Sequence, residues 1–289
     1  MMYDVLHDNK ISRLIEEALF EDVGLGDITT ESIVPSDARG KATLISKASG
    51  VIAGLEVMNA VFRAVDPGVT VEPHLSEGTG IAPGTTVATV EGPLGAILKA
   101  ERTALNFLQR MSGIATLTRS FVDAVAHTHA KITDTRKTAP SLRIIDKLAV
   151  ASGGGVNHRF GLDEMVLIKD NHIAIAGGVG LAIDKCQAYL RAANLDPKIE
   201  VEASNFAEVA EVLKHDGVHR IMLDNFTVEQ MRRAVDTINR RVEVEASGNV
   251  SLENVATIAE TGVDYISIGA LTHSAKALDV SLEVQPSGH

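Results

Sequence analysis

The feature that most constrains the fold is a regular alternation of strand-like and helix-like segments in the second half of the chain. Short apolar segments typical of β-strands lie near 131–135, 165–169, 198–202, 219–223, 242–246 and 263–268. Helical patterns fill most of the gaps, over 142–151, 179–193, 205–214, 227–240 and 251–261. Strands that alternate with helices form βαβ units and a parallel sheet. The pattern therefore predicts an α/β domain, either a closed barrel or a doubly wound sheet.

Two of these segments favour the barrel. The runs Ile199–Ser204 and Val242–Ser247 nearly repeat each other, and in both of them glutamates alternate with apolar residues. This spacing puts Glu200 and Glu202 on one face of the strand and the apolar residues on the other. A buried strand of a doubly wound sheet is expected to be apolar on both faces, whereas a barrel interior can open into a polar site. We therefore expect a barrel.

The first part of the chain follows a different pattern. A short amphipathic helix is expected over 10–21, and short alternating segments lie around 41–47, 51–54, 69–75 and 85–91, separated by glycines and prolines. A long helical stretch then runs from about 96 to 126, with a weak point at Ser112-Gly113. These patterns predict a small β-rich unit followed by a long helix.

Composition excludes several classes of function. The chain has 27 Lys and Arg against 38 Asp and Glu, and its aromatic content is 3% with no Trp, so neither a basic field nor base-stacking side chains point to nucleic acid. The single Cys186 excludes an intramolecular disulfide and any multi-cysteine zinc site. The first residues do not resemble a signal peptide, and no apolar run is long enough to span a membrane. We expect a cytoplasmic protein that binds neither nucleic acid nor membrane.

Charged and small residues gather at the expected carboxyl ends of the strands, where α/β barrels carry their sites. Cations follow or precede the first two strands, carboxylates end the middle strands, and small residues follow the last two. In chain order these residues are Arg136, Lys137, His158, Arg159, Lys169, Glu202, Asp224, Ser247, Gly248, Asn249, Gly269 and His273.

Each group has a characteristic chemistry. Arginine and lysine bind carboxylates and phosphates, and small residues that lead into a helix form a phosphate cradle. Paired carboxylates without clustered Cys or His suit Mg²⁺, which prefers oxygen ligands. The residues alone therefore predict a polyanionic substrate and either group transfer or isomerisation on a phosphorylated sugar. A Schiff-base aldolase that uses Lys169 remains an alternative.

At these residues the sequence resembles the quinolinate phosphoribosyltransferase family. The resemblance extends from Glu21-Asp22 to His273-Ser274 and thus over nearly the whole chain. The motifs that carry it are Gly26–Thr30, Ala100–Thr103 with Leu105-Asn106, Ser112–Thr116, Asp134–Thr138, Gly153–Arg159, Ile168–His172, Leu223–Phe226, Ala246–Gly248 and Gly269–Ser274. Each motif is weak alone, but together they are highly specific.

The resemblance implies an N-terminal α/β sandwich domain and a C-terminal incomplete barrel of the seven-stranded type. The implied boundaries are 1–112 for the sandwich with its linking helix, 113–275 for the catalytic barrel, and 276–289 for a tail that packs back on the sandwich. The implied assembly is a homodimer in which Arg102 reaches the partner's site. The implied reaction transfers phosphoribose from phosphoribosyl pyrophosphate to quinolinate with loss of CO₂, which gives nicotinate mononucleotide for NAD biosynthesis.

The resemblance also implies residue roles. Quinolinate would be bound by Arg102, Arg136, Lys137, His158, Arg159 and Lys169. Phosphoribosyl pyrophosphate would be bound by Glu202, Asp224, Ser247, Gly248, Asn249, Gly269 and His273, with Glu202 and Asp224 also holding Mg²⁺. The implied catalytic residues are Lys137, Lys169, Glu202 and Asp224.

One residue departs from the family pattern, and two related readings stay open. Ser141 stands where a glycine is expected, which puts the shape of that loop in question. Nicotinate is an alternative substrate, although its single carboxylate needs fewer cations. A non-catalytic relative of this fold is a second alternative, in which the dicarboxylate-binding cations would be expected to be missing.

Overall fold

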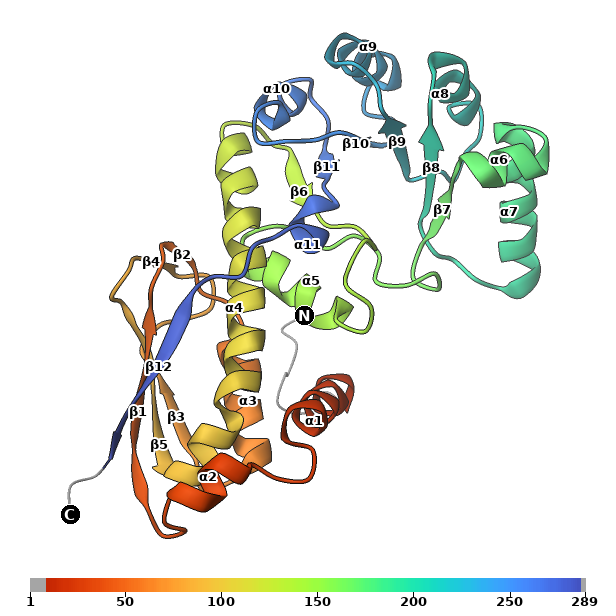
Figure 1. Cartoon of the computed structure of the whole chain (residues 1–289). Helices are drawn as coiled ribbons and strands as arrows, with labels where there is room; N and C mark the ends of the chain where they lie inside the picture. The colour runs from red at the N-terminus through yellow and green to blue at the C-terminus, as the bar shows by residue number, and fades with distance from the viewer. Residues whose placement is uncertain (1–8, 287–289) are drawn as a thin grey trace. The chain divides into compact units, whose positions relative to one another are not determined.

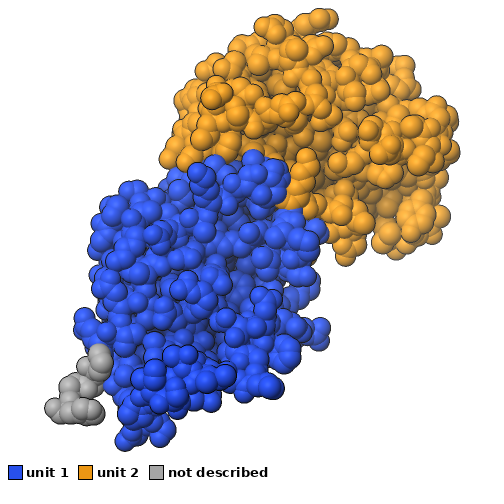
Figure 2. Space-filling model, in the orientation of Figure 1, with its two compact units in different colours: residues 1–119, 138–154, 270–289 blue, residues 120–137, 155–269 orange. Residues whose placement is uncertain are grey.

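The computed structural model describes residues 9–286, which form two compact units (Figure 2). Unit 1 comprises residues up to 119 together with 138–154 and 270 onward, and unit 2 comprises 120–137 and 155–269. Both units are thus built from segments that lie far apart in the sequence.

Unit 2 contains a sheet of six parallel strands (Figure 1). They are β6 (Lys131–Thr133), β7 (Val166–Ile168), β8 (Ile199–Ala203), β9 (Arg220–Asp224), β10 (Glu243–Ser247) and β11 (Tyr265–Ser267). These are the six strands predicted from the alternating pattern, although several are shorter than expected. The helices between them lie on the outer side of the sheet in Figure 1.

The order of the strands supports an incomplete barrel. The sheet runs β7-β8-β9-β10-β11-β6, so the last strand in the chain pairs with the first, as it does when a barrel closes. Among the described residues the ring is open between β6 and β7. Val156 forms a single parallel bridge with Thr133, which is the trace of a seventh strand. The α/β class and the incomplete barrel are therefore confirmed.

The helices of unit 2 follow the predicted pattern with one addition. α7 (Val179–Ala193), α8 (Phe206–Val212), α9 (Val228–Ile238) and α10 (Val255–Ala259) fall within the predicted ranges. The additional helix α6 (Asp170–Ala176) starts directly after β7, and the ring Nδ1 of His172 accepts a hydrogen bond from the backbone N–H of Lys169. This cap fixes the backbone at Lys169, which carries one of the predicted site side chains.

Unit 1 contains an antiparallel sheet in the order β12-β1-β5-β3. Its strands are β1 (Arg39–Ser46), β3 (Thr70–Pro73), β5 (Thr86–Pro93) and β12 (Val280–Pro286), and β2 (Gly50–Val51) pairs with β4 (Gly80–Ile81) in a separate ribbon. Buried and exposed residues alternate along most of β1, so one face of the sheet packs into the core. The chain end returns to this sheet as β12, which pairs with β1.

The helices of unit 1 are α1 (Asn9–Val23), α2 (Ile28–Ile33), α3 (Leu55–Val65), α5 (Arg143–Ser152), α11 (Ala270–His273) and most of α4 (Leu94–Val125). The predicted weak point of α4 at Ser112-Gly113 was wrong, because the helix is continuous there. Ser112 instead exchanges hydrogen bonds with the backbone of Ala53. A Cβ on Gly113 would lie 2.0 Å from the carbonyl oxygen of Lys276, so glycine is required by close backbone approach.

No single helix within residues 9–286 has the length and apolarity to cross a membrane; α6 and α7, which meet at 89°, pass that test only when taken together and only on length and composition.

Candidate functional site

A cavity of about 370 Å³ lies at the carboxyl ends of the unit 2 strands. Eight of the predicted site residues line it: Arg136, Lys137, His158, Arg159, Lys169, Glu202, Asp224 and Ser247. The remaining lining residues are Thr135, Leu167, Asp170, Met222, Glu245 and Ser267. The strand-end interpretation of the sequence therefore brought together side chains that are up to 111 residues apart in the chain.

The first part of the wall is cationic. Arg136 and Lys137 follow β6, where the Thr135 hydroxyl accepts a hydrogen bond from the backbone N–H of Lys137. Arg159 is almost fully buried, and its guanidinium donates to the carbonyl oxygen of Met165 at 2.9 Å. Burial and the neighbouring Arg136 lower the pKa of Arg159, while Glu200 raises it. Two guanidinium groups that repel each other in a half-enclosed cavity favour an anionic ligand between them.

The middle of the wall is acidic. Glu202 is the penultimate residue of β8 and Asp224 is the last residue of β9, and the ammonium group of Lys169 lies 3.7 Å from the Glu202 carboxylate. Burial raises the pKa of Glu202, as do the charges of Asp224 and Asp170, whereas Lys169 lowers it. A positive ligand beside Glu202 and Asp224 would relieve this repulsion.

The turn after β10 supplies the small residues. Gly248 has φ +95°, and a Cβ there would lie 2.2 Å from the side-chain oxygen of Asn225, so any larger residue would be both strained and obstructed. Asn249 has φ +50°, a left-handed conformation that asparagine tolerates better than most residues, and its amide donates to Asn225. Ser141, the departure from the family pattern, also has positive φ, at +65°. This explains why a glycine is expected there.

The remaining predicted residues lie outside the cavity wall. Gly269 follows β11 and directly precedes α11. Arg102 and His273 belong to unit 1, where Arg102 is an exposed residue of α4 and His273 ends α11. Their expected roles in binding remain predictions.

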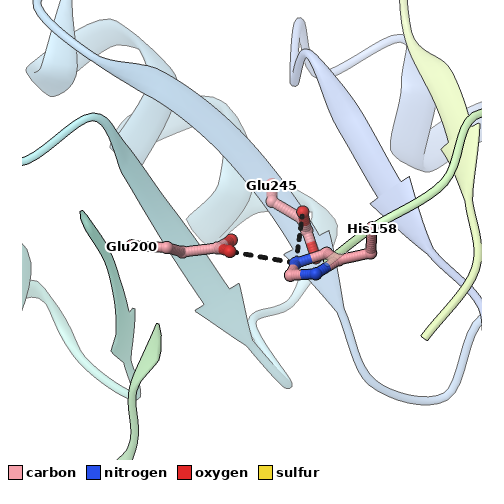
Figure 3. A group of neighbouring side chains, drawn as sticks. All are labelled: His158, Glu200 and Glu245. Carbon is pink, nitrogen blue, oxygen red and sulfur yellow. Dashed lines mark hydrogen bonds and ion pairs between the residues drawn. The ribbon is translucent and has the colours of Figure 1, made fainter. Parts of the chain in front are cut away.

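A cluster of His158, Glu200 and Glu245 extends from the cavity wall, which His158 and Glu245 line, into the interior at Glu200 (Figure 3). The Nε2 atom of His158 lies 2.9 Å from Glu200 Oε2 and 3.7 Å from Glu245 Oε2. The same oxygen of Glu245 accepts a hydrogen bond from Arg220 Nη1 at 2.8 Å. Burial raises the pKa of both glutamates to about 7. The cluster therefore carries two carboxyl groups whose ionised forms are disfavoured near neutral pH.

This burial predicts a pH-dependent stability. The Glu245 pKa is about 7 in the folded protein and near the ordinary 4.5 when unfolded, so the folded state binds the proton more tightly. The free energy of unfolding should therefore be highest near pH 4–5 and should fall by about 2–3 kcal/mol as the pH rises to 7. Urea unfolding at pH 5.5 and pH 8 should show a smaller loss for Glu245→Gln than for the unmodified protein. The exposed Glu253→Gln should keep the original loss, and identical losses for all three proteins would contradict this assignment.

Sequence reasoning missed two acids that border the site. Glu245 lines the cavity, and its signal was available, because it occupies in the second near-repeat the position that Glu202 occupies in the first. Asp134, directly after β6, is fully buried and accepts a hydrogen bond from the backbone N–H of His158 at 2.8 Å. Its role depends on a contact between distant segments, which spacing does not reveal.

Comparison with known proteins agrees with this site. The family model described as quinolinate phosphoribosyl transferase, N-terminal domain, matches residues 27–112, and the model of the C-terminal domain matches 114–283. Quinolinate phosphoribosyltransferase [decarboxylating] 1b of Nicotiana tabacum is 47% identical over 94% of this chain and 81% of its own length. Probable nicotinate-nucleotide pyrophosphorylase [carboxylating] of Synechocystis is 41% identical over 93% of this chain and 91% of its own.

The similarity extends to solved structures. The crystal structure of NadC from Streptococcus pyogenes has a TM-score of 0.92 and 39% identity, and the match covers 96% of this chain and 98% of that one. Nicotinate-nucleotide pyrophosphorylase from Ehrlichia chaffeensis has a TM-score of 0.89 at 40% identity, covering 95% and 98% of the two chains. Family models that span both halves, together with relatives far above 30% identity, leave no ambiguity. This chain belongs to the quinolinate phosphoribosyltransferase family.

Proposed function

We propose that this enzyme transfers the phosphoribosyl group of phosphoribosyl pyrophosphate to quinolinate and releases CO₂ and pyrophosphate, giving nicotinate mononucleotide for NAD biosynthesis. The observation that carries the proposal is the cavity at the carboxyl ends of the unit 2 strands, which joins five basic side chains to the carboxylates Glu202 and Asp224 and to Ser247 at the start of the small-residue turn. Two anionic substrates need such a site, in a protein whose net charge is −11.

Quinolinate binds at the basic wall in this proposal. Its two carboxylates accept hydrogen bonds from Arg136 and Arg159, and Lys137, His158 and Lys169 complete the pocket. Burial and the charge of Arg136 together lower the pKa of Arg159, and a dianionic ligand at this place would relieve the repulsion between the two guanidinium groups. Nicotinate, with one carboxylate, would leave part of this charge uncompensated, which favours quinolinate as the substrate.

Phosphoribosyl pyrophosphate binds at the acidic wall and at the turn after β10. Glu202 and Asp224 fit a Mg²⁺ ion, because both offer carboxylate oxygens to one cavity and because burial, together with the charge of Asp224, raises the pKa of Glu202. When bound, the ion would neutralise the charge of the pyrophosphate leaving group. Ser247, Gly248 and Asn249, with Gly269 and His273, would bind the 5-phosphate through short side chains and backbone N–H groups.

The chemistry requires mainly placement of the substrates. The pyridine nitrogen of quinolinate attacks C1 of the ribose, and the bond to pyrophosphate breaks with its electron pair leaving on oxygen. The resulting pyridinium nitrogen withdraws electrons from the neighbouring carbon, so the 2-carboxylate leaves as CO₂ and a proton replaces it. Lys137 and Lys169 line the cavity, and in this proposal their ammonium groups stabilise the carbanion while the cavity holds both substrates in register.

We further propose that the working form is a homodimer in which Arg102 completes the partner's quinolinate pocket. Exposed apolar side chains support an interface on each unit. In unit 1, Phe20, Leu25, Ile28 and Ile33 are each more than 70% exposed, and in unit 2, Leu162 and Ile175 are exposed to 72% and 86%. Clustered apolar side chains on a surface mark interaction sites.

For the cellular location, we propose the cytoplasm. The chain has one cysteine, Cys186, and it forms no intramolecular disulfide, which suits a reducing compartment. The Nicotiana tabacum relative 2a is named mitochondrial, and the rice relative is named chloroplastic. Fractionation of source cells with an antibody against the chain tests the proposal, and recovery in an organelle would overturn it.

Release of CO₂ from carboxyl-labelled quinolinate tests the function directly. We expect release only when quinolinate, phosphoribosyl pyrophosphate and Mg²⁺ are all present, and loss of release after addition of EDTA. Nicotinate in place of quinolinate should give little mononucleotide. A preference for nicotinate, or covalent trapping of a carbonyl substrate on Lys169 by borohydride, would overturn the proposal and favour one of the alternatives.

A further inference from the structure

His158 lines the cavity, yet both nitrogens of its ring are engaged by the protein. Nδ1 accepts a hydrogen bond from the backbone N–H of Arg159 at 2.8 Å. Because Nδ1 is the acceptor, the neutral ring carries its proton on Nε2, and Nε2 donates to Glu200 Oε2 at 2.9 Å. The ring is thus held between the main chain of Arg159 and a fully buried carboxylate, as Figure 3 shows for the Glu200 side.

The main chain around His158 is held as firmly as the ring. The backbone N–H of Val156 donates to Ile132 of β6, and the backbone N–H of Asp134 donates to Val156. Two residues further on, the backbone N–H of His158 donates to the Asp134 carboxylate at 2.8 Å. Asp134 is fully buried, so this hydrogen bond is shielded from water. The segment that ends in His158 is therefore fixed to the end of β6.

These contacts converge on Arg159. Its backbone N–H is bound to the His158 ring, and its guanidinium is directed by the carbonyl oxygen of Met165. Arg159 lines the cavity, and the preceding residue, His158, is hydrogen-bonded to Asp134 through its backbone and to Glu200 through its ring. Neither Asp134 nor Glu200 lines the cavity itself. A shift of either acid would move the guanidinium relative to the bound carboxylate.

We propose that Glu200 and Asp134 are positioning residues for quinolinate: acting through the ring and the backbone of His158, they hold Arg159 in the orientation that binds the substrate carboxylate. This assignment rests on the proposed function and goes beyond it, because neither acid contacts the substrate. Phosphoribosyl pyrophosphate binds elsewhere in the cavity, so its affinity should not depend on either acid.

A purely structural role for Glu200 predicts something different. Its side chain is fully buried, and Oε1 has no hydrogen-bond partner among the described residues. Removal of one partner of a buried hydrogen bond leaves the other partner unsatisfied, so Glu200→Leu is expected to lower the melting temperature whichever role Glu200 has. The distinguishing result is the KM: a positioning role raises the KM for quinolinate alone, whereas a purely structural role leaves both KM values of the folded enzyme unchanged.

The test compares two variants at each acid, one that keeps a hydrogen-bond acceptor and one that removes it. Glu200→Leu should raise the KM for quinolinate about tenfold or more, with the KM for phosphoribosyl pyrophosphate unchanged. Glu200→Gln keeps an acceptor for Nε2–H and should remain within about twofold of the unmodified enzyme. Asp134→Leu and Asp134→Asn should repeat this contrast. Glu243→Gln is the matched control, since Glu243 pairs with Arg220 on the same sheet, and should leave both KM values unchanged.

A spectroscopic measurement separates this inference from the proposed function. The ¹⁵N shifts of the His158 imidazole should report the Nε2–H tautomer in the unmodified protein, whatever reaction it catalyses, because Nδ1 accepts from the Arg159 backbone. In Glu200→Leu the Nε2 shift should move, because the hydrogen bond from Nε2–H to the carboxylate is lost. An unaltered Nε2 shift or an unaltered quinolinate KM in Glu200→Leu would overturn the inference. Equal increases in KM for both substrates would also overturn it. If the unmodified enzyme did not react with quinolinate at all, that result would count against the proposed function instead.

Discussion

Arg136→Ala and Arg159→Ala are each expected to raise the KM for quinolinate by at least about a hundredfold, while the KM for phosphoribosyl pyrophosphate changes little. Both guanidinium groups line the cavity, and Arg159 is almost fully buried. Removal of one partner of a desolvated charge pair costs about 3 kcal/mol, because the remaining carboxylate is left without its hydrogen bonds. Steady-state kinetics with each substrate varied in turn, at saturation of the other, gives the two constants separately.

The control for these variants is Arg232→Ala. Arg232 is an exposed residue of α9, and its loss removes the same charge from the protein without changing the cavity. Both KM values should stay at those of the unmodified enzyme. If either cavity variant weakened the binding of both substrates equally, the assignment of the basic wall to quinolinate would be wrong.

The alternating pattern of the second half predicted unit 2 well, because a parallel strand and its crossover helix differ strongly in hydrophobic period. The structure contains all six predicted strands, and the predicted helices over 179–193, 205–214, 227–240 and 251–261 are present as α7–α10. The first half was harder to interpret. The segment 51–54 was expected to be a strand, but only Gly50–Val51 is one, and α3 begins at Leu55. Gly54, at φ +98°, marks that helix start, and backbone conformation of this kind is not visible in an apolar pattern.

The sequence predicted those residues of the candidate site whose position follows from the end of a strand. Lys169, Glu202, Asp224 and Ser247 lie in the last two residues of a strand or directly after one, Arg136 lies three residues after β6, and all five line the cavity. The residues that hold this wall in place were not predictable in the same way. Asp134, Glu200 and Glu245 act through contacts between segments that are 24 to 87 residues apart, and such contacts exist only once the sheet has formed.

The second large effect concerns Arg102. If each site combines the barrel of one protomer with Arg102 of its partner, Arg102→Ala and Lys169→Ala should each be nearly inactive alone but active when mixed. In a heterodimer, the barrel of the Arg102→Ala chain keeps Lys169 and receives Arg102 from the other chain, so one of its two sites is intact. Because random exchange makes about half of the dimers mixed, the mixture should recover up to about a quarter of the unmodified activity.

A second mixture provides the control. Lys169→Ala and Glu202→Ala both alter the same cavity of unit 2, so every barrel in their heterodimers carries one of the two defects. That mixture should stay inactive after refolding or prolonged exchange, which must be verified by mass spectrometry of the mixed dimers. Activity in the first mixture and not in the second assigns Arg102 to the partner's site. Should mixed dimers form and the first mixture remain inactive, Arg102 would have to act within its own chain, and the exposed apolar side chains of unit 1 would need another explanation.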